Sequence, residues 1–551
     1  MNPYLPGFEY VPDGEPHIFG DRVYLYGSHD RFDGSQFCMN DYVCWSAPVD
    51  DLSSWRYEGV IYKKEQDPRN QNIPDDAPRS TSMFGIPARR KDSLLPNGMH
   101  SMFAPDVVQG KDGRFYLYYC LDFLPEVGVA VCDSPAGAYE FLGFVKHPDG
   151  ELLGKKEGDH YQFDPGVFMD VDGTVYLYSG NAPITLQQDP DWILMSQVMT
   201  LEDDMVTLKS EPKRLLCDLR DSAGTGFEGH EFFEASSIRR INGKYYFIYS
   251  SVQGHELCYA VSEKPDEGYV FGGTIVDICN IGINDIDYEH AQNPSGNTHG
   301  GLEYINGQWY IFYHRQTNRS NFSRQACAEP VYFDENGRIA QVEVTSSGML
   351  KHLSMIGSYP AYICSELNRN GFGGESQMIS CQMDFPFLTQ DADDTEPTEE
   401  NIHLDQLTPF QYICNIQDGT CAGYKYFDSE REDELKLTMT VRQCMYDIHP
   451  LMNEEDARLF AKTMGMADNE AFIEQVVSKA ASCTDPKKAV EPDGNFIVLI
   501  NGVESGKINV SGMNHDWKEI SGTVKVPQGK CRIRFVYEGR GILDFLKFEL
   551  K

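Results

Sequence analysis

A strand-like motif that recurs five times constrains the fold of this chain more than any other feature. The copies read GDRVYLYGS (20–28), DGRFYLYYC (112–120), DGTVYLYSG (172–180), NGKYYFIYS (242–250) and NGQWYIFYH (306–314). Each begins with a Gly-Asp, Asp-Gly or Asn-Gly pair, which favours a tight turn, and continues with the aromatic and β-branched residues typical of strands. We therefore expect each copy to be the second strand of a β-hairpin.

The spacing of the copies predicts the architecture. Their aligned tyrosines are separated by 92, 60, 70 and 64 residues and are Tyr24, Tyr116, Tyr176, Tyr246 and Tyr310. Each interval leaves room for a four-stranded sheet with its loops. The sequence therefore predicts an all-β fold whose first part is a five-bladed β-propeller.

An ionisable residue stands 10 to 12 positions before each aligned tyrosine; these residues are Asp13, Asp106, Asp164, Glu234 and His299. The innermost strand of each propeller blade lines the central channel, so five equivalent positions would meet in one pocket. Crowded carboxyl groups there would have pKa values pushed apart, which leaves one protonated and another ionised. Hydrolysis of a glycosidic bond needs such a pair. At any single site the alternative is an aspartate that caps a turn, but five phased sites favour a shared pocket.

Charge and composition exclude several classes of partner. The 551 residues carry a formal net charge of −37, so the chain lacks the basic stripe that nucleic acid or an anionic membrane requires. No apolar run reaches 18 residues, and the N-terminus MNPYLPGFEYVPDG lacks the pattern of a signal peptide. Fifteen cysteines without CxxC spacing are typical of free thiols, which predicts a cytoplasmic protein. The oligomeric state stays open.

The repeat pattern stops at about residue 365. An acidic segment without periodicity, TQDADDTEPTEEN (389–401), predicts a linker or long loop. Alternating segments such as ELKLTMTV, NFIVLING and CRIRFVYEG then predict a β-sandwich, with a short helical insertion at about 449–483. We therefore expect a propeller domain over 1–375 and a sandwich domain over 376–551. The two short helices are expected to pack against the sandwich.

Five segments together resemble glycoside hydrolase family 43, which includes β-xylosidases and α-L-arabinofuranosidases. They are PDGEPHIFGDRVYLYGSHD, FAPDVV, FDPGVFMDVDGTVYLYSG, FFEASSIRRINGKYYFIYSS and THGGLEYINGQWYIFYHR, in the family's order. The resemblance covers about residues 1–365. The C-terminal part resembles, more weakly, the carbohydrate-binding module of family 6.

The resemblance implies a role for individual residues. By position, Asp13 matches the general base, Asp164 the aspartate that modulates pKa, and Glu234 the general acid. His299 matches a channel histidine near a central ion or water, and Arg315 a sugar-contacting arginine. The resemblance implies no required cofactor and allows a structural Ca²⁺ in the channel, with His299 as its candidate ligand.

Three more residues complete the predicted substrate-binding set. Asp106 has the phase of the other channel residues, and Phe103 and Phe233 flank acidic positions, where they could form an apolar wall against a sugar. Packing within the blades is an equally good interpretation of both phenylalanines.

Two departures from the family pattern leave competitors for the catalytic roles. The usual DPS around the base is DGEP here, so Glu15 stands two residues from Asp13 and on the same face of a strand. The usual EGP around the acid is EAS, and Glu228 and Glu231 precede Glu234. The spacing from the aligned tyrosines favours Asp13 as the base and Glu234 as the acid.

The resemblance implies an inverting, exo-acting enzyme that releases xylose or arabinose from plant-type oligosaccharides. A galactofuranosidase or galactosidase of the same family and a non-catalytic sugar-binding propeller are the alternatives. The WMNDPNG-like N-terminal motif and the RDP motif of the related fructoside-acting enzymes are missing. A scaffold for protein partners would need basic or apolar surface patches, which this acidic chain does not indicate.

Overall fold

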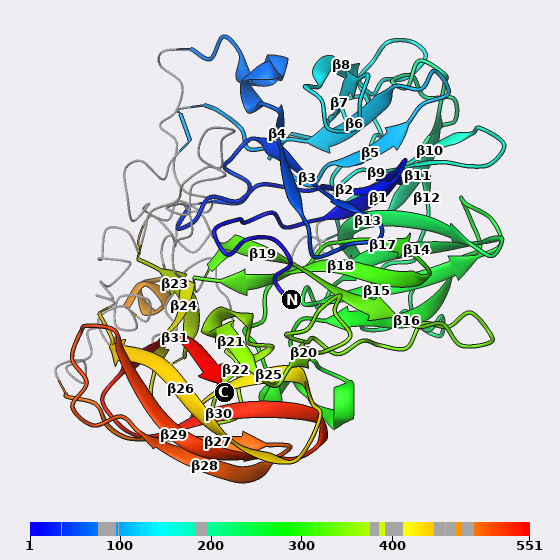
Figure 1. The fold of residues 1–551 in the computed structure, drawn as a ribbon. Helices are drawn as coiled ribbons and strands as arrows, with labels where there is room; N and C mark the ends of the chain where they lie inside the picture. Colours follow the sequence, from blue (N-terminus) through cyan, green and yellow to red (C-terminus); the bar gives the residue numbers. More distant parts are fainter. Residues whose placement is uncertain are drawn as a thin grey trace.

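The computed structural model describes residues 1–34, 36–74, 95–96, 98–122, 124–182, 195–318, 320–374, 385–391, 411–445, 458, 469–474 and 490–551. These residues form an almost entirely β structure (Figure 1). The short 3-10 helices are η1 (Lys64–Gln66), η2 (Pro68–Asn70), η5 (Ile283–Asp285), η6 (Tyr288–His290) and η7 (Ala361–Ile363). In the described part of the chain, no helix is both long and apolar enough to cross a membrane.

Five antiparallel sheets occupy residues 15–331, and each is built from strands that follow one another in the chain. The first contains β1 (Glu15–Phe19), β2 (Arg22–Tyr26), β3 (Tyr42–Pro48) and β4 (Arg56–Tyr62); the second β5 (Asp106–Gln109), β6 (Phe115–Cys120), β7 (Val127–Cys132) and β8 (Glu140–Phe144). The third contains β9 (Gly166–Met169), β10 (Val175–Ser179), β11 (Gln197–Leu201) and β12 (Lys213–Arg214); the fourth β13 (Phe232–Ile241), β14 (Lys244–Ser251), β15 (Glu256–Ser262) and β16 (Val270–Asp277). The fifth has three strands, β17 (Leu302–Ile305), β18 (Gln308–Thr317) and β19 (Ser320–Val331).

The repeated motif forms the second strand of every sheet, as the sequence predicts. The aligned tyrosines lie on β2, β6, β10, β14 and β18, and each of these strands pairs antiparallel with the strand before it. The hairpin turns contain glycines with positive φ, such as Gly113 and Gly173, both at +84°. Because only glycine adopts this conformation at little cost, the turn residues fix where each hairpin reverses.

The five sheets form a closed ring. The first strands contact one another in the order β1, β5, β9, β13, β17 and back to β1, and a parallel bridge joins Gly14 to Gly300 where the ring closes. Five hydrophobic clusters separate the sheets, and each draws its buried residues from two neighbours: first and second, second and third, third and fourth, fourth and fifth, and fifth and first. Every sheet thus buries both faces against its neighbours, which places the first strands around a common centre.

Buried tyrosines also link the sheets through hydrogen bonds. The hydroxyl group of Tyr26 in the first sheet donates to the Pro135 carbonyl of the second at 2.8 Å, and that of Tyr178 in the third donates to Pro265 of the fourth at 2.8 Å. Both tyrosine side chains are fully buried. Each ring therefore adds apolar contact while its hydroxyl group keeps a partner.

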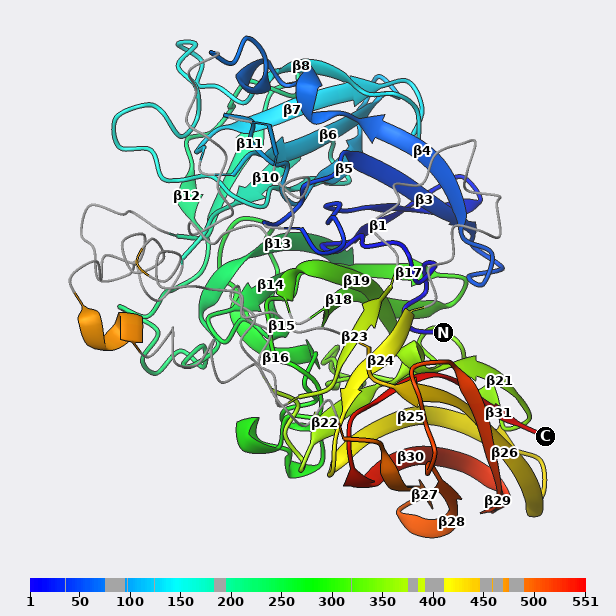
Figure 2. The same ribbon diagram turned by 90° about the vertical axis from the view of Figure 1, so that its left-hand side faces the viewer.

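Two six-stranded sheets follow the ring of five. One contains β20 (Leu353–Ser354), β22 (Glu366–Arg369), β25 (Thr420–Ser429), β27 (Asp493–Ile500), β28 (Val503–Asn509) and β30 (Gly529–Arg540). The other contains β21 (Gly357–Pro360), β23 (Phe387–Gln390), β24 (Gln411–Ile416), β26 (Asp433–Gln443), β29 (Lys518–Val526) and β31 (Leu543–Leu550). A single hydrophobic cluster takes residues from both sheets, including Val498 and Ile533 from one and Leu437 and Phe548 from the other. In Figures 1 and 2 these sheets, coloured mainly yellow to red, form one body at one end of the molecule.

The strand pairing changes ahead of the predicted domain boundary. Residues 353–369 fall within the first predicted domain, but β20 and β22 pair with β25, and β21 pairs with β31. The change from the ring to the C-terminal sheets therefore lies between Val331 and Leu353, and residue 375 lies outside the described residues. A helical turn at 470–474 falls in the predicted insertion at 449–483, most of which also lies outside them, as does most of the acidic segment 389–401.

Candidate active site

Four of the five predicted channel residues lie where the first strands of their sheets begin. Asp13 and Asp164 each stand two residues before such a strand, β1 and β9, and His299 stands three residues before β17. Glu234 is the third residue of β13. His299 Nδ1 lies 3.4 Å from Asp164 Oδ2, and the charges of Asp164, His299 and Asp13 all act on the carboxyl group of Glu234. The ring of sheets therefore brings these four side chains into one site.

The backbone is unusual at the three acidic residues. Asp13 and Asp164 have φ of +58° and +45°, and Ala235, next to Glu234, has φ of +70°. The pairing of β13 with β14 shifts register on both sides of Glu234. Left-handed conformations of residues other than glycine store strain and cluster at functional sites. Two of these conformations fall on Asp13 and Asp164 themselves and the third on the residue that follows Glu234.

Asp106 does not lie in this group, because its position along its strand differs from that of Asp13 along the first sheet. Asp106 pairs with Tyr118 as Glu15 pairs with Tyr26, so Asp106 and Glu15 occupy the same layer, two residues further along their strands than Asp13. The residue of the second sheet that corresponds to Asp13 is Ala104. Both oxygens of Asp106 are engaged: Oδ1 lies 2.6 Å from His17 Nε2, and Oδ2 accepts from the Val167 amide at 2.7 Å.

Glu15, the competitor for the role of base, has a structural partner. Its Oε2 lies 3.1 Å from Arg239 Nη2, and its side chain is almost fully buried. Burial raises the pKa of Glu15, which Arg239 only partly counters. Glu15 therefore belongs to the layer of Asp106 and not to that of Asp13.

Arg324 and His314, which the sequence analysis did not identify, surround Asp13. Arg324 Nη1 donates to Asp13 Oδ1 at 3.0 Å, and its Nε and Nη2 donate to Asp30 at 2.8 and 2.9 Å. His314 Nε2 is 2.8 Å from the Asn297 carbonyl, to which it donates, so that Nδ1 accepts from the Asp13 amide at 3.3 Å. Burial lowers the pKa of His314, which agrees with this neutral tautomer.

The site separates the pKa values of the Asp13 and Glu234 carboxyl groups. Burial alone would raise the pKa of Asp13, but Arg324 and, more weakly, His299 hold it well below its usual range. Burial raises the pKa of Glu234 well above its usual range, and the negative charge of Asp164 adds to this rise. At neutral pH Asp13 is therefore ionised and Glu234 keeps its proton. Asn181 Nδ2 donates to Glu234 Oε2 at 3.0 Å and so helps to orient the acid.

His299 and Asp164 form the pair between these two groups. Burial opposes the charged imidazolium, but the hydrogen bond and charge of Asp164 raise the pKa of His299 to about 9. A protonated imidazole repels cations, and Ca²⁺ takes six to eight oxygen ligands. Within the described residues, His299 belongs to none of the groups of three His, Cys, Asp or Glu side chains that lie close enough together to hold a metal ion. A structural Ca²⁺ at His299 thus gains no support from these side chains and stays a prediction.

A cluster of aromatic side chains includes Phe163, which precedes Asp164, and Phe37, which contacts Arg324. Phe103 is buried and packs edge to face on Phe163, with ring centroids 5.4 Å apart, and the Arg324 guanidinium stacks over Phe37 at 4.8 Å. Phe103 therefore belongs to a packed cluster beside the site. Phe233, next to Glu234 on β13, is partly exposed.

Arg315 lies away from the acidic residues. Its guanidinium donates to the carbonyls of Tyr362 at 2.8 Å and Cys364 at 3.2 Å, which belong to the segment that leads into the C-terminal sheets. It also lines a pocket between the fifth sheet and β23. The structure thus brings Asp13, Asp164, Glu234 and His299 together and leaves Arg315 and Asp106 outside the group.

Comparison with known proteins identifies the family of this chain. Residues 2–339 match the model of glycosyl hydrolases family 43. A xylosidase/arabinosidase of Thermoclostridium stercorarium is 40% identical over 560 residues, which cover 100% of this chain and 98% of that protein. A xylosidase/arabinosidase of Bacteroides ovatus is 26% identical over 62% of this chain and 97% of its own length, and a β-xylosidase of Xylanibacter ruminicola 27% identical over 62% and 99%. The chain therefore belongs to glycoside hydrolase family 43 and is a glycosidase.

Proposed function

We propose that this enzyme releases xylose or arabinose from the ends of plant-type oligosaccharides by a single, inverting displacement. The observation that carries the mechanism is the opposite environment of two carboxyl groups: Arg324 keeps Asp13 ionised, whereas burial and Asp164 keep Glu234 protonated. An inverting glycosidase needs one group in each state. The names of the relatives, xylosidase/arabinosidase and β-xylosidase, support a pentose substrate.

Each residue has a defined part in the reaction. Asp13 takes a proton from a water molecule while the water oxygen forms a bond to the anomeric carbon. The glycosidic bond breaks on the opposite side, and Glu234 gives its proton to the departing oxygen. Asp13 ends protonated and Glu234 ionised, and exchange of protons with solvent restores both. Asp164 acts through Glu234 and Arg324 through Asp13, which makes them positioning residues.

We also propose that the ring of five sheets is a five-bladed β-propeller and that the two C-terminal sheets form a β-sandwich resembling carbohydrate-binding module family 6. The closed order of the first strands and the cluster shared by the C-terminal sheets support this description. A cytoplasmic location is proposed as well. The described cysteines are free thiols, which is usual in reducing compartments.

Proton NMR of the first-formed sugar tests the mechanism. We expect inverted anomeric configuration when aryl β-xyloside or α-arabinofuranoside is hydrolysed and the spectrum is recorded before mutarotation. Retained configuration would overturn the single displacement. An aryl galactofuranoside in the same panel tests the substrate class, because turnover of that compound alone would replace the pentose assignment.

A further inference from the structure

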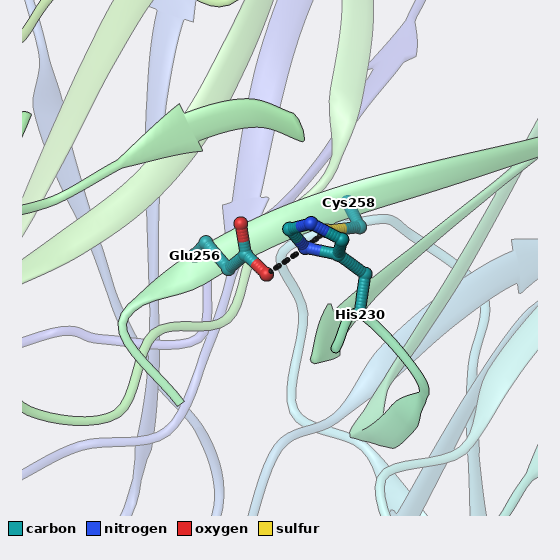
Figure 3. A group of neighbouring side chains, drawn as sticks. All are labelled: His230, Glu256 and Cys258. Atoms are coloured by element: carbon teal, nitrogen blue, oxygen red, sulfur yellow. Dashed lines mark hydrogen bonds and ion pairs between the residues drawn. The ribbon is translucent and has the colours of Figure 1, made fainter. Parts of the chain in front are cut away.

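A second group of potential ligands lies in the fourth sheet. Figure 3 shows His230, in the turn before β13, facing Glu256 and Cys258 of β15. Glu256 and Cys258 are two residues apart on one strand, so their side chains lie on the same face of the sheet. One ligand atom from each of the three residues lies within 4.8 Å of the other two. An imidazole nitrogen, a carboxylate oxygen and a sulfur atom therefore converge on one point.

The separations lie within about 0.7 Å of those around a tetrahedral zinc ion. With Zn–N and Zn–O bonds of roughly 2.0 Å and a Zn–S bond of roughly 2.3 Å, tetrahedral angles place N and S about 3.5 Å apart and N and O about 3.3 Å apart. His230 Nδ1 is 3.9 Å from Cys258 Sγ and 2.6 Å from Glu256 Oε1. To reach the metal-bound spacing, the distance from Nδ1 to Sγ would shorten by about 0.4 Å and the distance from Nδ1 to Oε1 would lengthen by about 0.7 Å.

Surrounding contacts already orient the ligands. The His230 imidazole stacks on Phe271 at 5.1 Å with an angle of 18° between the rings, and the His230 carbonyl accepts from the Tyr249 hydroxyl group at 2.7 Å. Glu256 accepts from the hydroxyl groups of Ser251 at 2.6 Å and Thr274 at 2.8 Å. Hydrogen-bonded carboxylates and fixed imidazoles are what metal sites use to hold their ligands in place.

Two other groups have suitable residue types but carry a competing cation. In the group of Glu15, His17 and Asp106, Arg239 lies 3.1 Å from Glu15. In the group of Cys414, Cys444 and Asp544, Arg442 donates to Asp544 at 2.9 Å. A metal ion in either place would meet a guanidinium group. The ion-pair partner of Glu256, by contrast, is His230, whose proton a metal ion can replace.

We propose that His230 Nδ1, a Glu256 carboxylate oxygen and Cys258 Sγ bind one divalent cation of the zinc class, with water in a fourth position. The mixture of nitrogen, oxygen and sulfur ligands selects zinc-like ions over calcium or magnesium. The His230 side chain is 37% exposed, which gives the ion a route from solvent to the buried Glu256 and Cys258. Binding releases the Cys258 thiol proton and the Nδ1 proton that His230 shares with Glu256.

Cobalt binding to the full chain tests this site. After treatment with a chelator, the protein is titrated with Co²⁺, whose charge-transfer absorption reports a thiolate ligand, and bound metal is counted by elemental analysis. We expect one Co²⁺ per chain with a thiolate band. The band should disappear in Cys258→Ser, and His230→Gln should weaken binding at least about tenfold, since even partners outside the ligand shell contribute this much.

Two variants serve as matched controls. Cys279→Ser removes a buried thiol that follows the same sheet, and His290→Gln removes an exposed imidazole outside the group; both should bind Co²⁺ as the unaltered chain does. A thiolate band that persists in Cys258→Ser, or no band in the unaltered chain, would overturn the proposal. If Cys258→Ser fails to fold, His230→Gln decides, because unchanged affinity in that variant contradicts the site equally.

Discussion

Replacement of Arg324 by methionine should lower the free energy of unfolding of the enzyme and move the acidic limb of its pH–rate profile. The guanidinium lies 3.0 Å from Asp13 and 2.8 Å from Asp30, and all three side chains are buried. At 3.0 Å and an effective dielectric constant of about 20, one such attraction is about 5.5 kcal/mol before the cost of burying the charges. Breaking a buried pair on one side typically costs about 3–5 kcal/mol, so we expect a loss of that size for Arg324→Met.

The variant should also shift the pH dependence in a defined direction. Without Arg324 the pKa of Asp13 rises, so the base becomes protonated at higher pH and the acidic limb of kcat/KM moves upward. The depressed pKa of Asp13 contributes stability above its unfolded value of about 3.9, and this contribution disappears as pH falls through the folded pKa. The difference in stability between the two proteins should therefore narrow below about pH 4.

The assay combines urea unfolding at several pH values with pH–rate profiles on an aryl glycoside. Arg56→Met, which removes an exposed arginine from its pair with Glu58, is the control and should cost no more than about 1 kcal/mol. An acidic limb that stays in place in folded Arg324→Met would refute the role of Arg324 in holding Asp13 ionised. Arg324→Lys keeps the charge but lacks the forked donors, so we expect a partial shift.

Three further substitutions test the site. Glu234→Gln should lose roughly 10²–10⁴-fold of its rate on substrates with poor leaving groups and less on glycosides of acidic phenols; equal losses on both would remove Glu234 from the acid role. Asp13→Ala should lower the hydrolysis rate about 10³-fold with the fold unchanged, whereas Glu15→Gln should keep its rate per folded molecule and lose thermal stability. Rate and melting measurements would show both effects. Exchanged phenotypes would reassign the base. Asp164→Asn should lower the pKa of Glu234 and move the basic limb of the pH–rate profile to lower pH, and an unmoved limb would argue against their coupling.

Local sequence determined the strands and their repetition. A turn pair such as Asp-Gly followed by an aromatic and β-branched run specifies a hairpin through contacts between near neighbours, and all five copies form one. The same repeat located Asp13, Asp164, Glu234 and His299, because equivalent positions in equivalent sheets face a common centre. No long-range information was needed for these predictions.

The tertiary structure alone decided what surrounds those residues. Arg324 reaches Asp13 across 311 positions of the chain, a contact that exists only because the fifth sheet closes the ring against the first. Asp106 lies two residues further along its strand than the position that corresponds to Asp13. The spacing of 10 to 12 residues before the aligned tyrosine is too variable to reveal this difference. Strand register fixes it, since side chains alternate with a period of two. The sequence placed residues 353–369 in the first domain, but their strands pair with the C-terminal sheets. Strand pairing depends on which sheet edge is free in space, and the sequence of a short strand does not show this.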